Sequence, residues 1–149
     1  MTRANLIKPP VVIIGAGYAG AHCATALRRA GYDGPIRLIG AEEFLPYDRP
    51  PLSKAWLKDE TTIARLTLRP ADFYADRDIA VMCGRRVTAI MADEHRIRLD
   101  DGTMLDYHAL VLAPGAAPRM LPDTMVGAED GDEAARARML SLRELADAR

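Results

Sequence analysis

The hydrophobic pattern of the chain starts with VVII (residues 11–14), a run of four β-branched residues. A short, continuously apolar run of this kind predicts a strand buried on both faces, as in a parallel sheet. Small and apolar residues then recur at helical spacing through 18–31, and Gly31 is a typical end of a helix. IRLIG (36–40) predicts a second strand, so 11–40 has the length of a β-α-β unit, about 30 residues.

The next segment predicts two short helices. Two prolines stand near the start of RPPLSKAWLKDE, and proline suits the first turn of a helix because its missing N–H would be unpaired there. We therefore expect one short helix over 51–58 and a second over 70–76.

After these helices the polar pattern changes to strand-like alternation. The pair Asp101-Gly102 is a hairpin turn signal and predicts a small antiparallel meander over 87–104. ALVLA (109–113) predicts a buried strand that returns to the parallel sheet, and the Ala-, Arg-, Glu- and Leu-rich stretch 128–149 predicts a helix. The expected fold class is α/β, a Rossmann-like parallel sheet with a glycine-rich β-α-β unit and an inserted antiparallel β-meander.

Composition narrows the class of protein. The length of 149 residues predicts one domain, and 49% hydrophobic with 28% charged residues is typical of a soluble globular protein. A formal net charge of -1 gives no reason to expect nucleic acid or an anionic membrane as partner. No apolar run approaches a membrane span, and the N-terminus is a poor signal peptide, so we expect a cytoplasmic protein. The two cysteines have no metal-ligand spacing, and no metal site is expected.

The first strand is followed by a glycine fingerprint. Gly15, Gly17 and Gly20 form G-x-G-x-x-G between the predicted strand and the predicted helix. In this motif the first glycine permits a tight turn, the second lets backbone approach a pyrophosphate, and the third lets the helix lie close to the strand. The N-terminus of the helix then presents unpaired N–H groups to phosphates, and Ala16 and Ala19 keep the approach uncluttered.

An acidic residue follows at the position that such a motif requires. Glu42 lies 22 residues after Gly20, just past the second strand, where a carboxylate can bond a ribose hydroxyl. The alternative is a solvated loop carboxylate, but strand, glycines, helix and acid in this order favour dinucleotide binding. The fingerprint itself does not distinguish NAD from FAD.

The segment YDRPPLSK (47–54) is far rarer than a glycine turn. Together with the fingerprint and LDYHALVLAPGAAPRMLP (105–122), it closely resembles the N-terminal FAD-binding segment of the NADH-dependent ferredoxin reductases. These flavoproteins serve oxygenases and belong to the pyridine nucleotide-disulfide oxidoreductase superfamily. The resemblance implies FAD as cofactor, NADH as substrate of the intact enzyme, and a ferredoxin-type iron–sulfur protein as electron acceptor.

The resemblance also implies the residues of a cofactor site, although no catalytic residue. The pyrophosphate would lie along the fingerprint, the adenosine ribose at Ala41 and Glu42, and the adenine at the backbone of Val87. Arg49 and Lys54 would face the flavin and the phosphates, and a cation near N1 stabilises reduced flavin. The implied cofactor-binding residues are Gly15, Ala16, Gly17, Ala19, Gly20, Ala41, Glu42, Arg49, Lys54, Val87, Ala113, Pro114, Gly115 and Arg143.

Three departures from related patterns bear on this assignment. Some relatives carry an acid at the position of Ala41. Pro114 replaces the threonine of the family's Ala-Thr-Gly turn, which removes a hydroxyl and a backbone N–H. PLSKAWL (51–57) lacks the cysteine pair of the disulfide reductases, so electrons would leave the flavin for an external acceptor rather than a dithiol.

The sequence stops before the family's NADH domain, and we interpret 1–149 as the N-terminal part of an FAD-binding domain. One hypothesis is the FAD-binding part of an NAD(P)H-dependent ferredoxin reductase. The alternatives are a truncated nucleotide-binding fragment without turnover, or the FAD segment of a nitrite-reductase-type or apoptosis-factor-type flavoprotein. An uncovered sheet face would favour self-association.

Overall fold

The computed structural model describes residues 10–122 and 139–148 of the chain. These residues form two compact units, each described by itself. The first contains 10–48 and 67–115, and the second contains 49–66 with the described part of 116–148. Among the described residues, no helix has the length and apolar character needed to cross a membrane.

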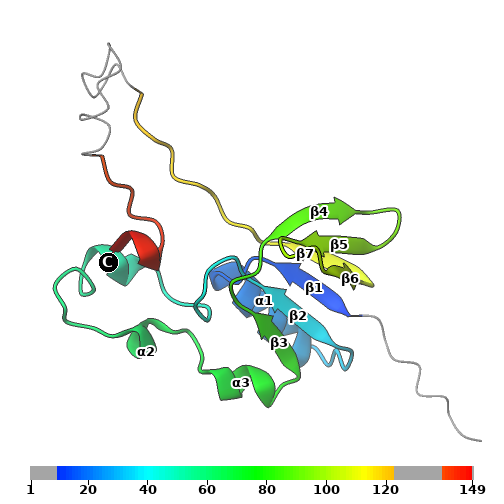
Figure 1. Cartoon of the computed structure of the whole chain (residues 1–149). Coiled ribbons are helices and arrows are strands. Elements are labelled where there is room, and N and C mark those ends of the chain that lie inside the picture. Colours follow the sequence, from blue (N-terminus) through cyan, green and yellow to red (C-terminus); the bar gives the residue numbers. More distant parts are fainter. Residues whose placement is uncertain (1–9, 123–138, 149) are drawn as a thin grey trace, which may run out of the picture. The chain divides into compact units, whose positions relative to one another are not determined.

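The first unit is built on a four-stranded parallel sheet with the strand order β3-β2-β1-β7 (Figure 1). Val11 of β1 pairs with Ile36 of β2 on one side and with Ala109 of β7 on the other. The strands are β1 (Val11–Ile14), β2 (Ile36–Ile39), β3 (Ile79–Met82) and β7 (Ala109–Leu112). The predicted β-α-β unit and the predicted return of the 109–113 segment to the parallel sheet are confirmed.

A separate antiparallel sheet forms the predicted meander. Its strands, in the order β4-β5-β6, are β4 (Val87–Met91), β5 (Arg96–Leu99) and β6 (Met104–Asp106). Gly102 turns the chain with a φ of 84°, and its N–H donates to the Leu99 carbonyl over 3.1 Å. The Asp101 carboxylate accepts the Thr103 N–H at 2.9 Å, so this turn is closed by the residues that predicted it.

The parallel sheet has a core on each face. Val11 and Ile13 pack in one buried cluster with Ala24 of the helix α1 (Tyr18–Arg29). Val12 points to the opposite face and packs in a second cluster with Ile97 of β5. The α/β fold is therefore layered, with α1 on one face of the parallel sheet and the meander on the other (Figure 1).

Arg28 holds the C-terminal end of α1 in place. Its guanidinium donates to four backbone carbonyls, those of Tyr32 (2.6 Å), Gly34 (2.7 Å), Arg77 (2.6 Å) and Asp78 (2.8 Å). The last two belong to the turn that leads into β3. These bonds hold the C-terminal end of α1 next to the start of β3, and they thereby help to fix the position of the helix on the sheet.

Between β2 and β4, one helix was predicted correctly and two short elements were missed. The expected helix 70–76 is confirmed as the short α3 (Ala71–Ala75). The strand β3 was not predicted, because in IAVM only Ile79 is fully buried and Ala80 is exposed, so its pattern is weak. The helix α2 (Ile63–Leu66) of the second unit was not predicted either.

The prediction of a helix over 51–58 is wrong in type and extent. The chain forms a 3-10 helix, η1 (Pro50–Ser53), followed by turns. Leu52 N–H bonds the Arg49 carbonyl and Lys54 N–H bonds the Pro51 carbonyl, both over three residues. Pro50 and Pro51 have no N–H to donate, which limits the α-helical ladder at this point.

The prediction of a helix over 128–149 is wrong for 139–144, which are not helical, and 145–148 form the 3-10 helix η2 (Leu145–Ala148). The rest of that prediction lies outside the described residues. The Asp147 carboxylate accepts the N–H groups of Arg143 and Glu144, each at 2.7 Å. A carboxylate bonded in this way caps the start of a turn and competes with a continuous helix.

Candidate functional site

The turn between β1 and α1 starts at Gly15. Its φ is 108°, a conformation that L side chains rarely adopt, and its N–H donates to the Ile39 carbonyl at 2.8 Å. A Cβ at this position would overlap the Ala113 carbonyl and lie 3.1 Å from the Cα of Pro114. The structure therefore brings two separately predicted pieces of the site into contact, the glycine turn and the turn after β7.

Gly20 lies against the same turn from the helix side. It is buried, and a Cβ here would overlap the Gly15 carbonyl oxygen and lie 3.1 Å from Leu38 Cδ1. This is the close approach of helix and strand that the third glycine of the motif permits. Gly20 and Gly15 therefore have a packing role that does not depend on a ligand.

Gly17 is different because its surroundings are open. It is the N-cap of α1 with a φ of -86°, and no atom of the described residues lies within 4 Å of where its Cβ would be. No side chain caps the helix, and its first turn contains no acidic residue. The helix N-terminus keeps N–H groups and a positive partial charge that no side-chain cap satisfies, and this donor set suits the pyrophosphate of a dinucleotide.

The loop after β2 is fixed beside this turn. Gly40 donates its N–H to Met82 (2.9 Å) and accepts that of Arg85 (2.9 Å), and the Glu42 carbonyl accepts the N–H of Gly84 (2.8 Å). A Cβ on Gly40 would lie 2.5 Å from the Cβ of Ala16, so the two turns are in close contact. Sequence analysis missed Gly40, whose position at the end of a buried strand was the available signal.

The remaining predicted residues of the first unit lie around these turns. Val87 begins β4, two residues after the Arg85 N–H that bonds Gly40. Ala41 is exposed next to the half-buried Glu42. Among the exposed residues, Ala19 lies in the first turn of α1 and Gly115 has a φ of 73°. These residues lie near the carboxyl ends of the parallel strands, the position at which ligands of open α/β sheets bind.

Cys83 directly follows β3, and its surroundings do not activate it as a nucleophile. Burial, with the nearby Glu43 carboxylate, raises the pKa of its thiol, which donates to the Phe44 carbonyl at 3.3 Å. The protonated thiol is thus favoured, and Cys83 and Cys23 are not joined in a disulfide. Within 10–122 and 139–148, no cluster of His, Cys, Asp and Glu could hold a metal ion.

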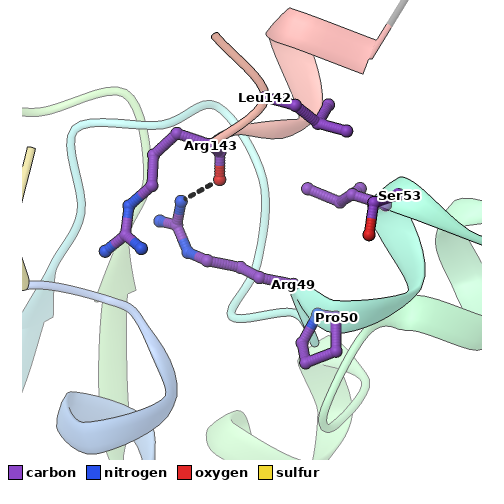
Figure 2. Close-up of a pocket in the computed structure, with 6 residues that line it drawn as sticks. Arg49, Pro50, Ser53, Leu142 and Arg143 are labelled. Carbon is purple, nitrogen blue, oxygen red and sulfur yellow. Dashed lines mark hydrogen bonds between the residues drawn. The ribbon is translucent and has the colours of Figure 1, made fainter. Parts of the chain in front are cut away.

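The second unit contains a pocket of about 200 Å³ lined by two of the predicted cofactor residues, Arg49 and Arg143 (Figure 2). Arg49 Nη1 donates to the Arg143 carbonyl at 2.6 Å, and Figure 2 shows the two guanidinium groups on the same side of the pocket. The other lining residues are Pro50, Leu52, Ser53 and Leu142. Lys54 is exposed at the C-terminal end of η1 and does not line this pocket.

Three further bonds hold the segment that carries Arg143. Trp56 Nε1 donates to the Ala148 carbonyl at 2.8 Å, and Asp147 caps the turn as described above. The bonds from the Glu144 and Arg143 N–H groups, with a smaller effect from Arg49, lower the pKa of the Asp147 carboxyl. The lowered pKa favours the ionised carboxylate at neutral pH.

A family model described as pyridine nucleotide-disulphide oxidoreductase matches residues 9–148, nearly the whole chain. The chain belongs to this family. Several proteins named as ferredoxin reductases are similar to it in sequence or in structure.

Two relatives show the similarity in sequence. Rhodocoxin reductase of Rhodococcus erythropolis is 46% identical over 112 residues, and putidaredoxin reductase of Pseudomonas putida is 47% identical over 112 residues. Each match covers 75% of this chain and 26% of the relative. The chain thus spans about a quarter of the length of these relatives.

Solved structures show the same similarity. The putidaredoxin reductase in its covalent complex with putidaredoxin matches with a TM-score of 0.80 and 42% identity, over 94% of this chain and 32% of that one. The ferredoxin reductase of the CYP199A2 system from Rhodopseudomonas palustris matches with a TM-score of 0.78 and 40% identity, over 95% and 33%. The α/β fold class and the resemblance to the N-terminal segment of ferredoxin reductases are both confirmed.

Proposed function

We propose that this chain is the FAD-binding part of an NAD(P)H-dependent ferredoxin reductase. In such an enzyme electrons pass from NADH through FAD to an iron–sulfur protein of an oxygenase system. The observation that carries the proposal is the open helix N-terminus at Gly17, placed between two tightly packed glycines and next to the fixed loop of Glu42. The ferredoxin reductases among the relatives support the choice of FAD over NAD at this first fingerprint.

In this proposal the first unit holds the ADP half of the cofactor. Gly15, Ala16, Gly17, Ala19 and Gly20 would accommodate the pyrophosphate, because the turn and the first turn of α1 present N–H groups without obstructing side chains. Ala41 and Glu42 would meet the ribose, Val87 the adenine, and the turn of Ala113, Pro114 and Gly115 would close over the cofactor. Pro114 has no N–H and no hydroxyl, so it would donate no hydrogen bond to the cofactor.

The cations of the second unit are proposed to serve the flavin half and the phosphates. A bound flavin accepts a hydride and releases electrons one at a time, and positive charge near its N1 stabilises the reduced form. Arg49, Lys54 and Arg143 supply such charge. Arg49 also bonds the Arg143 backbone, so it would fix the position of that residue as well as contribute its own charge.

The proposal also includes a partner and a location. The structure of putidaredoxin reductase with putidaredoxin supports a ferredoxin-type iron–sulfur protein as partner, and a cytoplasmic location is part of the proposal. Self-association is proposed through an uncovered face of the parallel sheet, and Leu112 of β7 has 62% of its surface exposed. An exposed apolar surface of this kind favours association.

A second candidate is a nucleotide-binding fragment that binds the cofactor without turnover. The two candidates differ in whether the chain is part of an enzyme that oxidises NADH, and in neither are the 149 residues expected to do so alone. Hydride transfer requires the nicotinamide stacked on the flavin, and such positioning can supply about 7–11 kcal/mol of the barrier. The sequence contains a single G-x-G-x-x-G.

The test is equilibrium dialysis of the 149-residue chain with FAD or FMN, followed by an assay with NADH and a dye acceptor. We expect weak, saturable FAD binding and none of FMN, because FMN lacks the ADP half that the first unit would recognise. NADH oxidation should stay at the rate of free FAD. Equal binding of FMN would contradict the assigned site, and sustained acceptor reduction above the free-FAD rate would contradict the expected lack of turnover.

A further inference from the structure

Tyr47 lies close to the one carboxylate assigned to the ribose. Its hydroxyl donates to Oε2 of Glu42 over 2.5 Å. Tyr47 is the first residue of the rare YDRPPLSK segment, whose cations were assigned to the flavin half of the cofactor. Sequence analysis did not assign this tyrosine to the site.

The tyrosine ring is held firmly enough to orient its partner. Tyr47 is 7% exposed, and its backbone forms an antiparallel bridge with Thr67. Next to the bridge, Leu68 N–H donates to the Pro46 carbonyl at 2.8 Å. The phenol oxygen is therefore presented from an anchored backbone, not from a free surface rotamer.

Glu42 is fixed through its main chain, since its carbonyl accepts the Gly84 N–H at 2.8 Å, but a glutamate side chain keeps three rotatable bonds. A hydrogen bond to one carboxylate oxygen restricts those rotations. A carboxylate has about four acceptor sites, so it can accept a phenol and the hydroxyls of a ribose at the same time.

We propose that Tyr47 is a positioning residue that orients the Glu42 carboxylate for the ribose hydroxyls of an adenine nucleotide. The inference rests on the proposed function, which assigns Glu42 to the ribose. Removing the phenol oxygen removes one restraint on the orientation of the carboxylate, and ligand binding then has to supply that restraint. The loss of affinity should appear only with ligands that carry the ribose hydroxyls.

The experiment compares the binding of ADP with that of 2′,3′-dideoxy-ADP by calorimetric titration of the 149-residue chain and of four variants: Tyr47→Phe, Glu42→Ala, the double variant and Tyr74→Phe. Tyr47→Phe should lower the affinity for ADP about threefold to tenfold, the range of one hydrogen bond, and leave the affinity for dideoxy-ADP unchanged. In the background of Glu42→Ala, the same substitution should change neither affinity. Tyr74→Phe is the matched control, because Tyr74 is 2% exposed and its hydroxyl has no hydrogen-bond partner among the described residues.

The ratio of the two affinities keeps the test valid if Tyr47→Phe lowers stability, since a smaller folded fraction weakens both ligands equally. An unchanged ratio in Tyr47→Phe, while Glu42→Ala weakens ADP, would overturn the positioning role and leave the proposed function intact. If Glu42→Ala leaves the affinity for ADP unchanged, the assignment of Glu42 to the ribose is wrong, and the positioning role of Tyr47 is wrong with it.

Discussion

Gly17→Val is expected to weaken FAD and ADP binding by about 100-fold, because its side chain would occupy the space in which the pyrophosphate meets the helix N-terminus. Loss of two hydrogen bonds to a charged group, at about 1.5–3 kcal/mol each, corresponds to at least this factor. The fold should tolerate the change, since the φ of Gly17 is -86° and a Cβ there meets nothing within 4 Å among the described residues.

Binding is measured by calorimetric titration and folding by urea unfolding of the same samples. Valine is a poor N-cap, so we allow a loss of about 1 kcal/mol in the free energy of unfolding. Undiminished FAD binding by a folded Gly17→Val chain would show that the cofactor lies elsewhere.

Gly20→Ala is expected to have the opposite profile and to destabilise the fold by about 3 kcal/mol or more. Its added Cβ would overlap the Gly15 carbonyl oxygen, a backbone atom that cannot move without separating α1 from the turn. Helix propensity alone would favour alanine over glycine by about 1 kcal/mol, so the predicted sign is the reverse of the local preference.

Gly17→Ala is the matched control, the same chemical change three residues away on the same turn. Urea unfolding should show Gly20→Ala far less stable than Gly17→Ala, and any loss of ADP binding by Gly20→Ala should follow its unfolded fraction. Equal stability of the two variants would mean that helix and turn are not packed as closely as the structure has them.

The sequence predicts the first unit well because its signals are local. VVII, the glycine spacing and Asp101-Gly102 each determine a strand or a turn within a few residues, and the structure has β1, α1 and the meander where they were expected. The strand β3 escaped prediction because it is short and is defined by pairing with β2, with Ile36 opposite Ile79.

The second unit was harder to predict because distant residues define it. Arg49 bonds the carbonyl of Arg143, 94 residues away, and Trp56 bonds that of Ala148, 92 residues away. These bonds take up carbonyls of a segment whose composition alone favours a helix. A propensity argument cannot include partners that far along the chain.

In the candidate site, too, local signals could be predicted from the sequence and contacts between separate loops could not. The position of Glu42 follows from its spacing to the glycines, but the bond from Tyr47 does not, because both residues lie in an irregular loop. Gly40 was missed for a similar reason, since its contact with Ala16 arises only when two turns come together.

The most direct test of the account is an amide chemical-shift map of the ¹⁵N-labelled 149-residue chain titrated with ADP. The account predicts saturable shifts that are largest at residues 15–20 and 41–43, with smaller ones near 87 and 113–115. Shifts confined to the meander strands β5 and β6, or the absence of any saturable shift, would contradict the assignment of this turn as a dinucleotide site.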